Sequence, residues 1–254
     1  MATLLHNTKI GQCVYCFEVR CDLSDEHIVP FALNGRWILQ KASCQICSKI
    51  TSLIERNVCR ELLAPTRAYF KFQTRRPKDR PTHFPLTIER SGKESRVMIP
   101  IEEYGAVTTF TTFDYPARFL GKTVEGIVVT GQLFNRIGGM DPKELSKKYG
   151  TNVLGFPRTY KPTDFAKLLA KIAYGFTVGY FGLGAIEDAY VLPALLNKID
   201  SIGNWVGMSD RGLIKREDIG VEIELVDKEI IVRIQFFGLF DGSPTYMVLV
   251  GRIK

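Results

Sequence analysis

Two Cys-x-x-Cys pairs constrain this chain more than any other feature of its sequence. The pairs are Cys13/Cys16 and Cys44/Cys47, and 27 residues separate them. Four thiolates at this spacing are typical of a tetrahedral zinc site, in which the metal supplies folding energy that a short segment lacks. All six cysteines lie in the first 59 residues, whereas a disulfide-stapled protein distributes its bridges along the chain. A redox dithiol explains one pair but not two, so we predict structural zinc on these four cysteines.

The remaining two cysteines, Cys21 and Cys59, have no partner at that spacing. An unpaired cysteine usually behaves as a small hydrophobic residue. We therefore predict that both are buried and take no part in the metal site.

The overall composition is that of an ordinary globular protein. Of the 254 residues, 45% are apolar, 24% charged and 11% aromatic, which excludes a collagen-like, coiled-coil or wholly disordered chain. No run of about 18 apolar residues is present to cross a bilayer, and the N-terminal MATLLHNTKIGQC lacks the apolar core of a secretory signal. We expect a soluble, intracellular protein that does not bind membranes.

The formal net charge is +7, and almost all of the excess lies in the first third of the chain. Residues 1–80 hold thirteen Lys and Arg against seven Asp and Glu, whereas the other 174 residues hold twenty-one against twenty. Such a concentration of positive charge favours a polyanionic partner. The residues that we expect to contact nucleic acid are Arg60, Arg67, Lys71, Arg75 and Arg76.

The segment between the two cysteine pairs has the pattern of a β-hairpin. In the run Glu26-His27-Ile28-Val29-Pro30 the β-branched pair favours a strand that the proline ends, and Asn34-Gly35 signals a turn. Residues 36–39 can then return as the second strand. After Cys44, apolar residues recur at helical spacing until Pro65. The expected order is therefore a Cys-x-x-Cys turn, the hairpin, the second Cys-x-x-Cys turn and a helix.

This combination of C-x-x-C, E-H-I-V-P, A-L-x-G and A-S-C-x-x-C at the start of a helix resembles the HNH endonucleases. It is most similar to their zinc-stapled ββα-metal subgroup, whose module has a treble-clef-like fold. The resemblance covers about residues 11–64. It implies a cytoplasmic protein of a bacterium or a phage-infected cell, with a role in restriction or anti-phage defence. It also implies an endonuclease that acts on DNA in preference to RNA.

The roles of individual residues follow from the same resemblance. Glu26 would hold a catalytic Mg²⁺ or Mn²⁺, and His27 would act as the general base. A divalent metal neutralises the scissile phosphate and holds the departing O3′. An imidazole, with an unperturbed pKa of about 6.5, can take a proton from the attacking water. The products would carry 5′-phosphate and 3′-hydroxyl ends.

One position departs from the family pattern. Ser48 follows the fourth cysteine, where the family usually has Asn or His as a further metal ligand. A serine hydroxyl is a weaker and shorter ligand, which can hold the metal directly or through water. Glu55 shares the same face of the helix, but it is about 10 Å further along and cannot take the place of Ser48.

This departure leaves three interpretations open. The first is an active HNH-type endonuclease. The second is a zinc-stabilised nucleic-acid-binding module whose nuclease centre has lapsed at Ser48. The third is a zinc-ribbon interaction protein without nucleic-acid binding, which the basic charge of residues 1–80 argues against.

The rest of the chain predicts an α+β fold with an antiparallel sheet. Residues 84–90 and 96–101 read as a hairpin, residues 107–113 and 124–134 as further strands, and residues 221–253 as a three-stranded meander. A helix is expected from Pro162, with Thr163 as its N-cap and with Lys167 and Lys171 on its outer side. A second helix is expected near residues 193–202.

We divide the chain into three parts. Residues 1–64 form the HNH-like module and residues 65–82 a basic connector, in which aromatic side chains either stack on bases or pack in the core. Residues 83–254 form an α+β domain that targets the module, after a boundary marked by prolines. The sequence does not choose between a modified base, a DNA structure and a protein as the ligand of this domain. A homodimer or a protein partner stays open.

Overall fold

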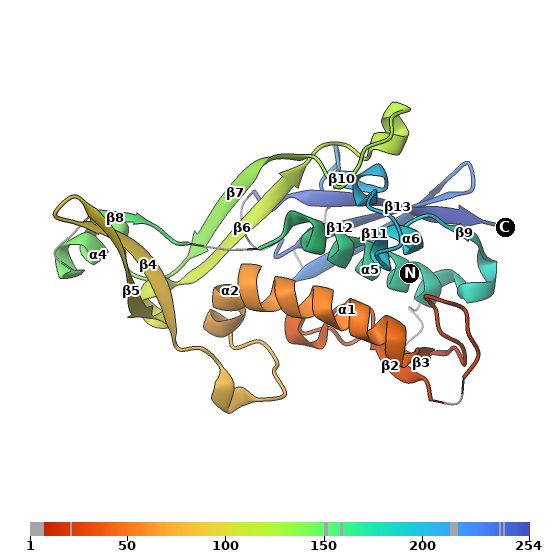
Figure 1. Ribbon diagram of the computed structural model, residues 1–254, viewed down its shortest axis with the longest axis horizontal. Coiled ribbons are helices and arrows are strands. Elements are labelled where there is room, and N and C mark those ends of the chain that lie inside the picture. Colours follow the sequence, from red (N-terminus) through yellow and green to blue (C-terminus); the bar gives the residue numbers. More distant parts are fainter. Residues whose placement is uncertain are drawn as a thin grey trace.

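The computed structural model describes residues 8–20, 22–149, 152–157, 160–213, 218–238, 240 and 242–254. It confirms a mixed α+β fold with antiparallel sheets (Figure 1). The long helix α5 (Pro162–Phe181) lies in the middle of the molecule. It packs against helix α1 (Gln45–Asn57) on one side and against the C-terminal sheet on the other.

The N-terminal segment forms a three-stranded sheet in the order β1-β3-β2, followed directly by α1. The strands are β1 (Thr8–Lys9), β2 (Ser24–His27) and β3 (Ile38–Ser43). Strands β2 and β3 are antiparallel and β1 is parallel to β3. The expected hairpin is therefore present, although β2 ends at His27 and the buried pair Ile28 and Val29 follows it.

The turn between β2 and β3 has a specific requirement for glycine. A short 3-10 helix (Phe31–Leu33) ends at Asn34, which adopts a left-handed conformation with φ of 60°. A Cβ atom on Gly35 would lie 1.9 Å from the main-chain oxygen of Val29. The backbone can therefore pass so close to the preceding strand only because residue 35 has no side chain.

The helix after the second cysteine pair continues to Pro65, but in pieces. Helix α1 ends at Asn57, a π-helical turn covers Val58–Leu62, and α2 (Ala64–Tyr69) follows. Pro65 lies in the first turn of α2, where the missing N–H group is tolerated. The proline thus begins a helix and does not end one, which corrects the expected stop at Pro65. A 3-10 turn (Pro77–Asp79) completes the basic connector.

A second group of strands, with α4, projects at the left of Figure 1. The order in its sheet is β5-β4-β8, and β6 pairs with β7 in a separate ribbon. The elements are β4 (His83–Arg90), β5 (Lys93–Pro100), α3 (Ile101–Tyr104), β6 (Ala106–Phe113), a 3-10 turn (Ala117–Leu120), β7 (Val129–Ile137), α4 (Pro142–Tyr149) and β8 (Asn152–Gly155). Ser91 and Gly92 both have positive φ, as a two-residue hairpin turn requires, so the β4–β5 hairpin is confirmed.

The C-terminal sheet confirms the expected meander. Its order is β10-β13-β12-β11, with β9 also paired to β13, and all of its pairings are antiparallel. The strands are β9 (Ile186–Ala189), β10 (Val206–Met208), β11 (Ile219–Val226), β12 (Glu229–Phe236) and β13 (Thr245–Ile253).

The predicted helical details of this region were less accurate. The second helix was predicted too long, because α6 covers only Leu192–Leu195, with 3-10 turns at Leu183–Ala185 and Ile202–Asn204. Thr163 is not the N-cap of α5: Lys161 holds that position, and Pro162 is the first helical residue. Proline favours this first position because its fixed φ suits the helix.

One apolar core connects the beginning of the chain to its end. It extends from Cys13 to Val250 and includes Leu39, Ile54 and Phe165. Helix α5 is buried around most of its circumference, as expected for a helix between two layers. Whether residues 1–64 also fold alone, as the three-part division supposes, stays a prediction. No described helix has the length and the apolar character needed to cross a membrane.

Candidate functional site

The four paired cysteines come together in space. Their sulfur atoms all lie within 4.8 Å of one another, and the Sγ atoms of Cys16 and Cys44 are 3.7 Å apart. Two thiolates on one tetrahedral zinc would be about 3.8 Å apart, given a Zn–S distance of about 2.3 Å. Three of the four cysteines are buried and Cys16 is half-buried. The cluster can therefore hold a metal such as zinc.

The remaining cysteine chemistry agrees with this arrangement. No disulfide links the described cysteines. Burial raises the pKa of the Cys47 thiol, and the neighbouring thiols raise it further, so four thiolates cannot share this space without a cation. Cys59 is buried, as predicted, and burial raises its pKa to about 12. Cys21 lies outside the described residues.

Glu26 is held by a lysine that belongs to α5. The carboxylate oxygen Oε1 of Glu26 lies 2.8 Å from Nζ of Lys171, and both side chains are nearly inaccessible. Burial raises the pKa of the Tyr15 hydroxyl, and the charge of Glu26 together with a hydrogen bond to it raises that pKa further. The carboxylate of Glu26 therefore already has two partners from within the protein.

The same ammonium group binds a second carboxylate. Oε1 of Glu55, on α1, is also 2.8 Å from Nζ of Lys171. The ammonium also donates hydrogen bonds to the main-chain oxygen of His27 and, at 3.3 Å, to that of Ile28. Burial alone would lower the pKa of Lys171, but the two carboxylates more than offset this effect and raise it. Lys171 is therefore a charged residue inside the core.

This finding corrects the expected position of Lys171 on the outer side of α5. Only 1% of the side chain is exposed. The sequence did contain a signal, because the residues around Lys171 are almost all apolar. A helix that is apolar on every side is buried, and a lysine inside it needs an anionic partner.

The residues at this position do not fit a catalytic divalent metal in the arrangement observed. Glu26 is occupied by Lys171 and Tyr15. Ser48 lies in the first turn of α1, and among the described residues its hydroxyl forms no hydrogen bond to Glu26 or His27. Glu55, which was placed too far along the helix to replace Ser48, instead shares a cation with Glu26. The structure thus gives Glu26 a partner other than the implied Mg²⁺ or Mn²⁺.

His27 has the opposite environment. Neighbouring residues of a strand point to opposite faces, so the imidazole is half-buried while Glu26 points into the core. The ring contacts Phe31, with a centroid distance of 5.9 Å. Burial lowers the pKa of His27, and the charges of Lys171 and Arg75 lower it as well, although the nearby carboxylates partly oppose them. The imidazole is therefore neutral at neutral pH and can accept a proton.

A basic pocket follows this site along the chain. Its volume is about 680 Å³, and its lining contains five arginines and one acidic residue, Asp79. The arginines are Arg60, Arg67, Arg75, Arg76 and Arg80. Arg75, which lines this pocket, is also one of the charges that lower the pKa of His27.

Two of the pocket arginines are committed to the fold. Arg67 donates hydrogen bonds of 2.7 and 2.8 Å to the main-chain oxygens of Ala32 and Cys59, and Arg80 donates one to Phe72. Arg60 and Arg75 are exposed and have no acidic partner among the described residues, whereas Arg76 faces Asp79 at 3.9 Å. Lys71 is exposed. The predicted set therefore contains cations that can meet a ligand and one, Arg67, that supports the backbone.

The aromatic residues of the connector also divide between the two expected roles. Phe72 is buried and packs against Phe237, with ring centroids 5.8 Å apart. Phe70 is 42% exposed and lies between Phe72 and Phe240. Packing against the C-terminal part of the chain thus accounts for Phe72, and Phe70 keeps a face open to solvent.

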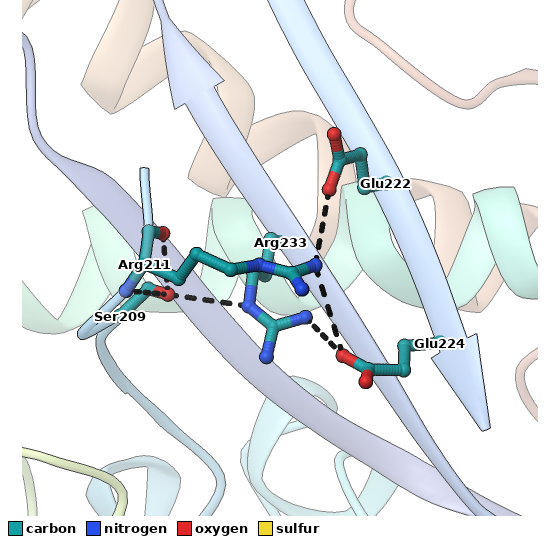
Figure 2. Close-up of polar contacts among 5 residues, drawn as sticks. All are labelled: Ser209, Arg211, Glu222, Glu224 and Arg233. Carbon is teal, nitrogen blue, oxygen red and sulfur yellow. Dashed lines mark hydrogen bonds and ion pairs between the residues drawn. The ribbon is translucent and has the colours of Figure 1, made fainter. Parts of the chain in front are cut away.

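A second charged cluster lies on the C-terminal sheet (Figure 2). Arg233 binds Glu224 and donates a hydrogen bond of 3.3 Å to the hydroxyl of Ser209. Arg211 reaches Glu222 at 3.4 Å and Glu224 at 3.9 Å. Both arginines are thus paired with carboxylates. We assign the cluster a structural role.

Comparison of the chain with protein-family models, with curated proteins and with solved structures finds no match in any of the three. The likeness to the HNH endonucleases therefore depends on the motif residues alone. What the structure adds is the four-cysteine cluster, the cation shared by Glu26 and Glu55, and the basic pocket lined by five arginines.

Proposed function

We propose that this chain is a zinc-stabilised nucleic-acid-binding protein, built on an HNH-like N-terminal module. The single observation that carries the proposal is the basic pocket, whose lining contains five arginines and only one acidic residue. A guanidinium group can donate two parallel hydrogen bonds to the oxygens of one phosphate, and the binding of such cations to a polyanion releases counterions. Zinc on the four cysteines would fix the strand and helix that precede this pocket.

Arg60 and Arg75 are the phosphate-binding residues in this proposal, because they are exposed and unpaired among the described residues. Arg76 and Lys71 add charge at the rim, while Arg67 keeps α2 attached to the hairpin turn. Phe70 offers an exposed ring on which a base can stack. The partner is DNA in preference to RNA, in line with the family resemblance.

The test is a binding titration with the zinc-loaded full chain. Fluorescence anisotropy would follow labelled duplex DNA, single-stranded DNA and RNA between about 50 and 200 mM salt, the range in which phosphate contacts dominate the affinity. The double variant Arg60→Gln/Arg75→Gln should bind at least about tenfold more weakly, and its salt slope should be smaller by about 2, one for each lost phosphate contact. Arg118→Gln, which removes an exposed arginine outside the pocket, should bind as the wild type does. Equal binding by all three proteins would refute the proposal.

A second candidate function, endonuclease activity, is favoured by His27. A half-buried imidazole, whose pKa is lowered by burial and by the charges of Lys171 and Arg75, is suited to take a proton from a water that attacks a bound phosphodiester. A cleavage assay on plasmid, single-stranded DNA and RNA, with Mg²⁺, Mn²⁺ or EDTA, separates the two candidates. An HNH-type enzyme would cut only with the metal and would lose cutting in His27→Ala while still binding. The binding module would not cut under any of these conditions.

A further inference from the structure

The ammonium group of Lys171 lies where oxygen ligands from two elements converge. Two carboxylates, from Glu26 on β2 and Glu55 on α1, each approach it to 2.8 Å. Two main-chain oxygens, from His27 and Ile28, point at the same atom. Carboxylate and carbonyl oxygens are the ligands that Mg²⁺, Mn²⁺ and Ca²⁺ prefer. The surroundings of this nitrogen are therefore those of a hard cation.

The ammonium uses its full donor capacity in this position. A lysine has three N–H groups, and the oxygens of Glu26, Glu55 and His27 can accept one each. With 1% of Lys171 and 8% of Glu26 exposed, solvent has almost no access to the group. A divalent ion cannot reach both carboxylates while the ammonium remains between them.

The charges give a reason why some cation must be present. The two carboxylates repel each other, and Glu26, at 8% exposed, loses nearly all of its solvation while Glu55, at 24%, loses part of it. One positive charge from Lys171 relieves this repulsion. Lys171 belongs to α5, and it contacts a main-chain oxygen 144 residues earlier in the sequence. The cation therefore comes from the C-terminal part of the chain.

We propose that Lys171 is the resident cation of the Glu26/Glu55 pair and competes with a divalent metal for it. The inference goes beyond the proposed function, because it concerns the carboxylate pair next to His27 and not the basic pocket. It explains why the implied catalytic metal does not fit: the protein supplies its own cation there. Without the ammonium group, a pair of carboxylates and two carbonyl oxygens are left that a divalent metal can bind.

The test measures Mn²⁺ binding by electron paramagnetic resonance, on the zinc-loaded full chain without nucleic acid. Lys171→Met should take up one Mn²⁺ at least tenfold more tightly than the wild type. The added substitution in Lys171→Met/Glu26→Gln should return the affinity to that of the wild type. Lys167→Met, which removes an exposed-side lysine one turn earlier on α5, serves as the matched control and should leave Mn²⁺ binding unchanged.

Equal Mn²⁺ affinity in a folded Lys171→Met protein and the wild type would overturn the inference. A second comparison decides the matter if Lys171→Met does not fold. The wild type and Glu26→Gln should then bind the same amount of Mn²⁺, and an ion that only the wild type binds would show that metal reaches Glu26 despite Lys171. The absence of nucleic-acid binding would refute the proposed function and leave these metal titrations unaffected.

Discussion

Lys171 and Arg233 are both cations with little exposure, and both bind glutamates, but they connect very different parts of the chain. The main-chain oxygen that Lys171 reaches on His27 is 144 residues away in sequence, whereas Arg233 binds a glutamate nine residues away on the neighbouring strand. The partners also differ in exposure, at 8% and 24% for Glu26 and Glu55 and at 39% for Glu224. One cation joins distant segments inside the core, and the other lies across a hairpin at the surface.

The different exposure of the partner glutamates decides how much the loss of each cation destabilises the protein. Glu224 can turn toward water if Arg233 is removed, because it is already partly solvated. Glu26 has no such exit, since it lies under α5 and is nearly inaccessible. The stability lost when one partner of an ion pair is removed therefore depends less on the distance between the charges than on whether water can solvate the remaining partner. The four-cysteine cluster extends the comparison, because it joins residues 28 positions apart within the N-terminal segment.

The largest effect is expected from the cysteines. Cys44→Ser should lose bound zinc and lower the melting temperature strongly, because the free energy of zinc binding in such sites is about 10–16 kcal/mol and equals the stability of a whole domain. Cys59→Ala is the matched control, since Cys59 is buried outside the cluster and should retain zinc. Zinc content by mass spectrometry and melting by circular dichroism check both. An unchanged zinc content in Cys44→Ser would exclude the four-cysteine assignment.

The next effect compares the two cations directly. Lys171→Met should reduce the free energy of unfolding by about 3–5 kcal/mol, because it leaves the buried carboxylate of Glu26 without its cation. Arg233→Met should reduce it by about 1 kcal/mol, since Glu224 becomes solvated. Urea denaturation of both zinc-loaded variants, in buffer without Mg²⁺ or Mn²⁺, gives the two values. If Arg233→Met proved as harmful as Lys171→Met, partner exposure would not be the deciding factor.

The same contrast explains which parts of the molecule the sequence predicts. The β4–β5 hairpin and the C-terminal meander were predictable, because alternation and turn residues specify neighbours that are close in sequence. The four cysteines were predictable from spacing alone. In each case the information lies within a few residues or in a chemically distinctive side chain.

The partners of Glu26 were not predictable in this way. The resemblance to the HNH endonucleases implied a catalytic metal at Glu26, but the residue that binds its carboxylate lies on a helix far along the chain. The spacing of apolar residues predicts one buried face of the helix and assigns a lysine to the opposite, solvent-facing side. It does not show that α5 is packed on both sides, which is why Lys171 was expected to be exposed. Arg67 shows the same limit, since its hydrogen bonds to Ala32 and Cys59 depend on how the hairpin meets α2.

The smallest expected effect is a difference in pH dependence between the two clusters. The hydrogen bond and the ion pair that Glu224 forms with Arg233 lower the pKa of Glu224 below its ordinary value. A lowered pKa in the folded state means that the pair contributes stability above the unfolded pKa of about 4.3 and loses it as the pH falls further. The stability difference between the wild type and Glu224→Gln should therefore shrink between about pH 4.3 and pH 3, and it should stay below about 1 kcal/mol because Glu224 is exposed.

Lys171 should show the reverse dependence, because the two carboxylates raise its pKa despite burial. A raised pKa in the folded state means that the contribution is complete below the unfolded pKa of about 10.4 and is lost as the pH rises above it. The stability difference between the wild type and Lys171→Met should thus stay constant from pH 7 to about pH 10 and then decrease. Urea denaturation across this range, with Lys167→Met as the control for a partly exposed lysine on the same helix, measures it. A difference that already declines near pH 8 would mean that the ammonium is not held by both carboxylates, and the contrast with Arg233 would then lose its basis.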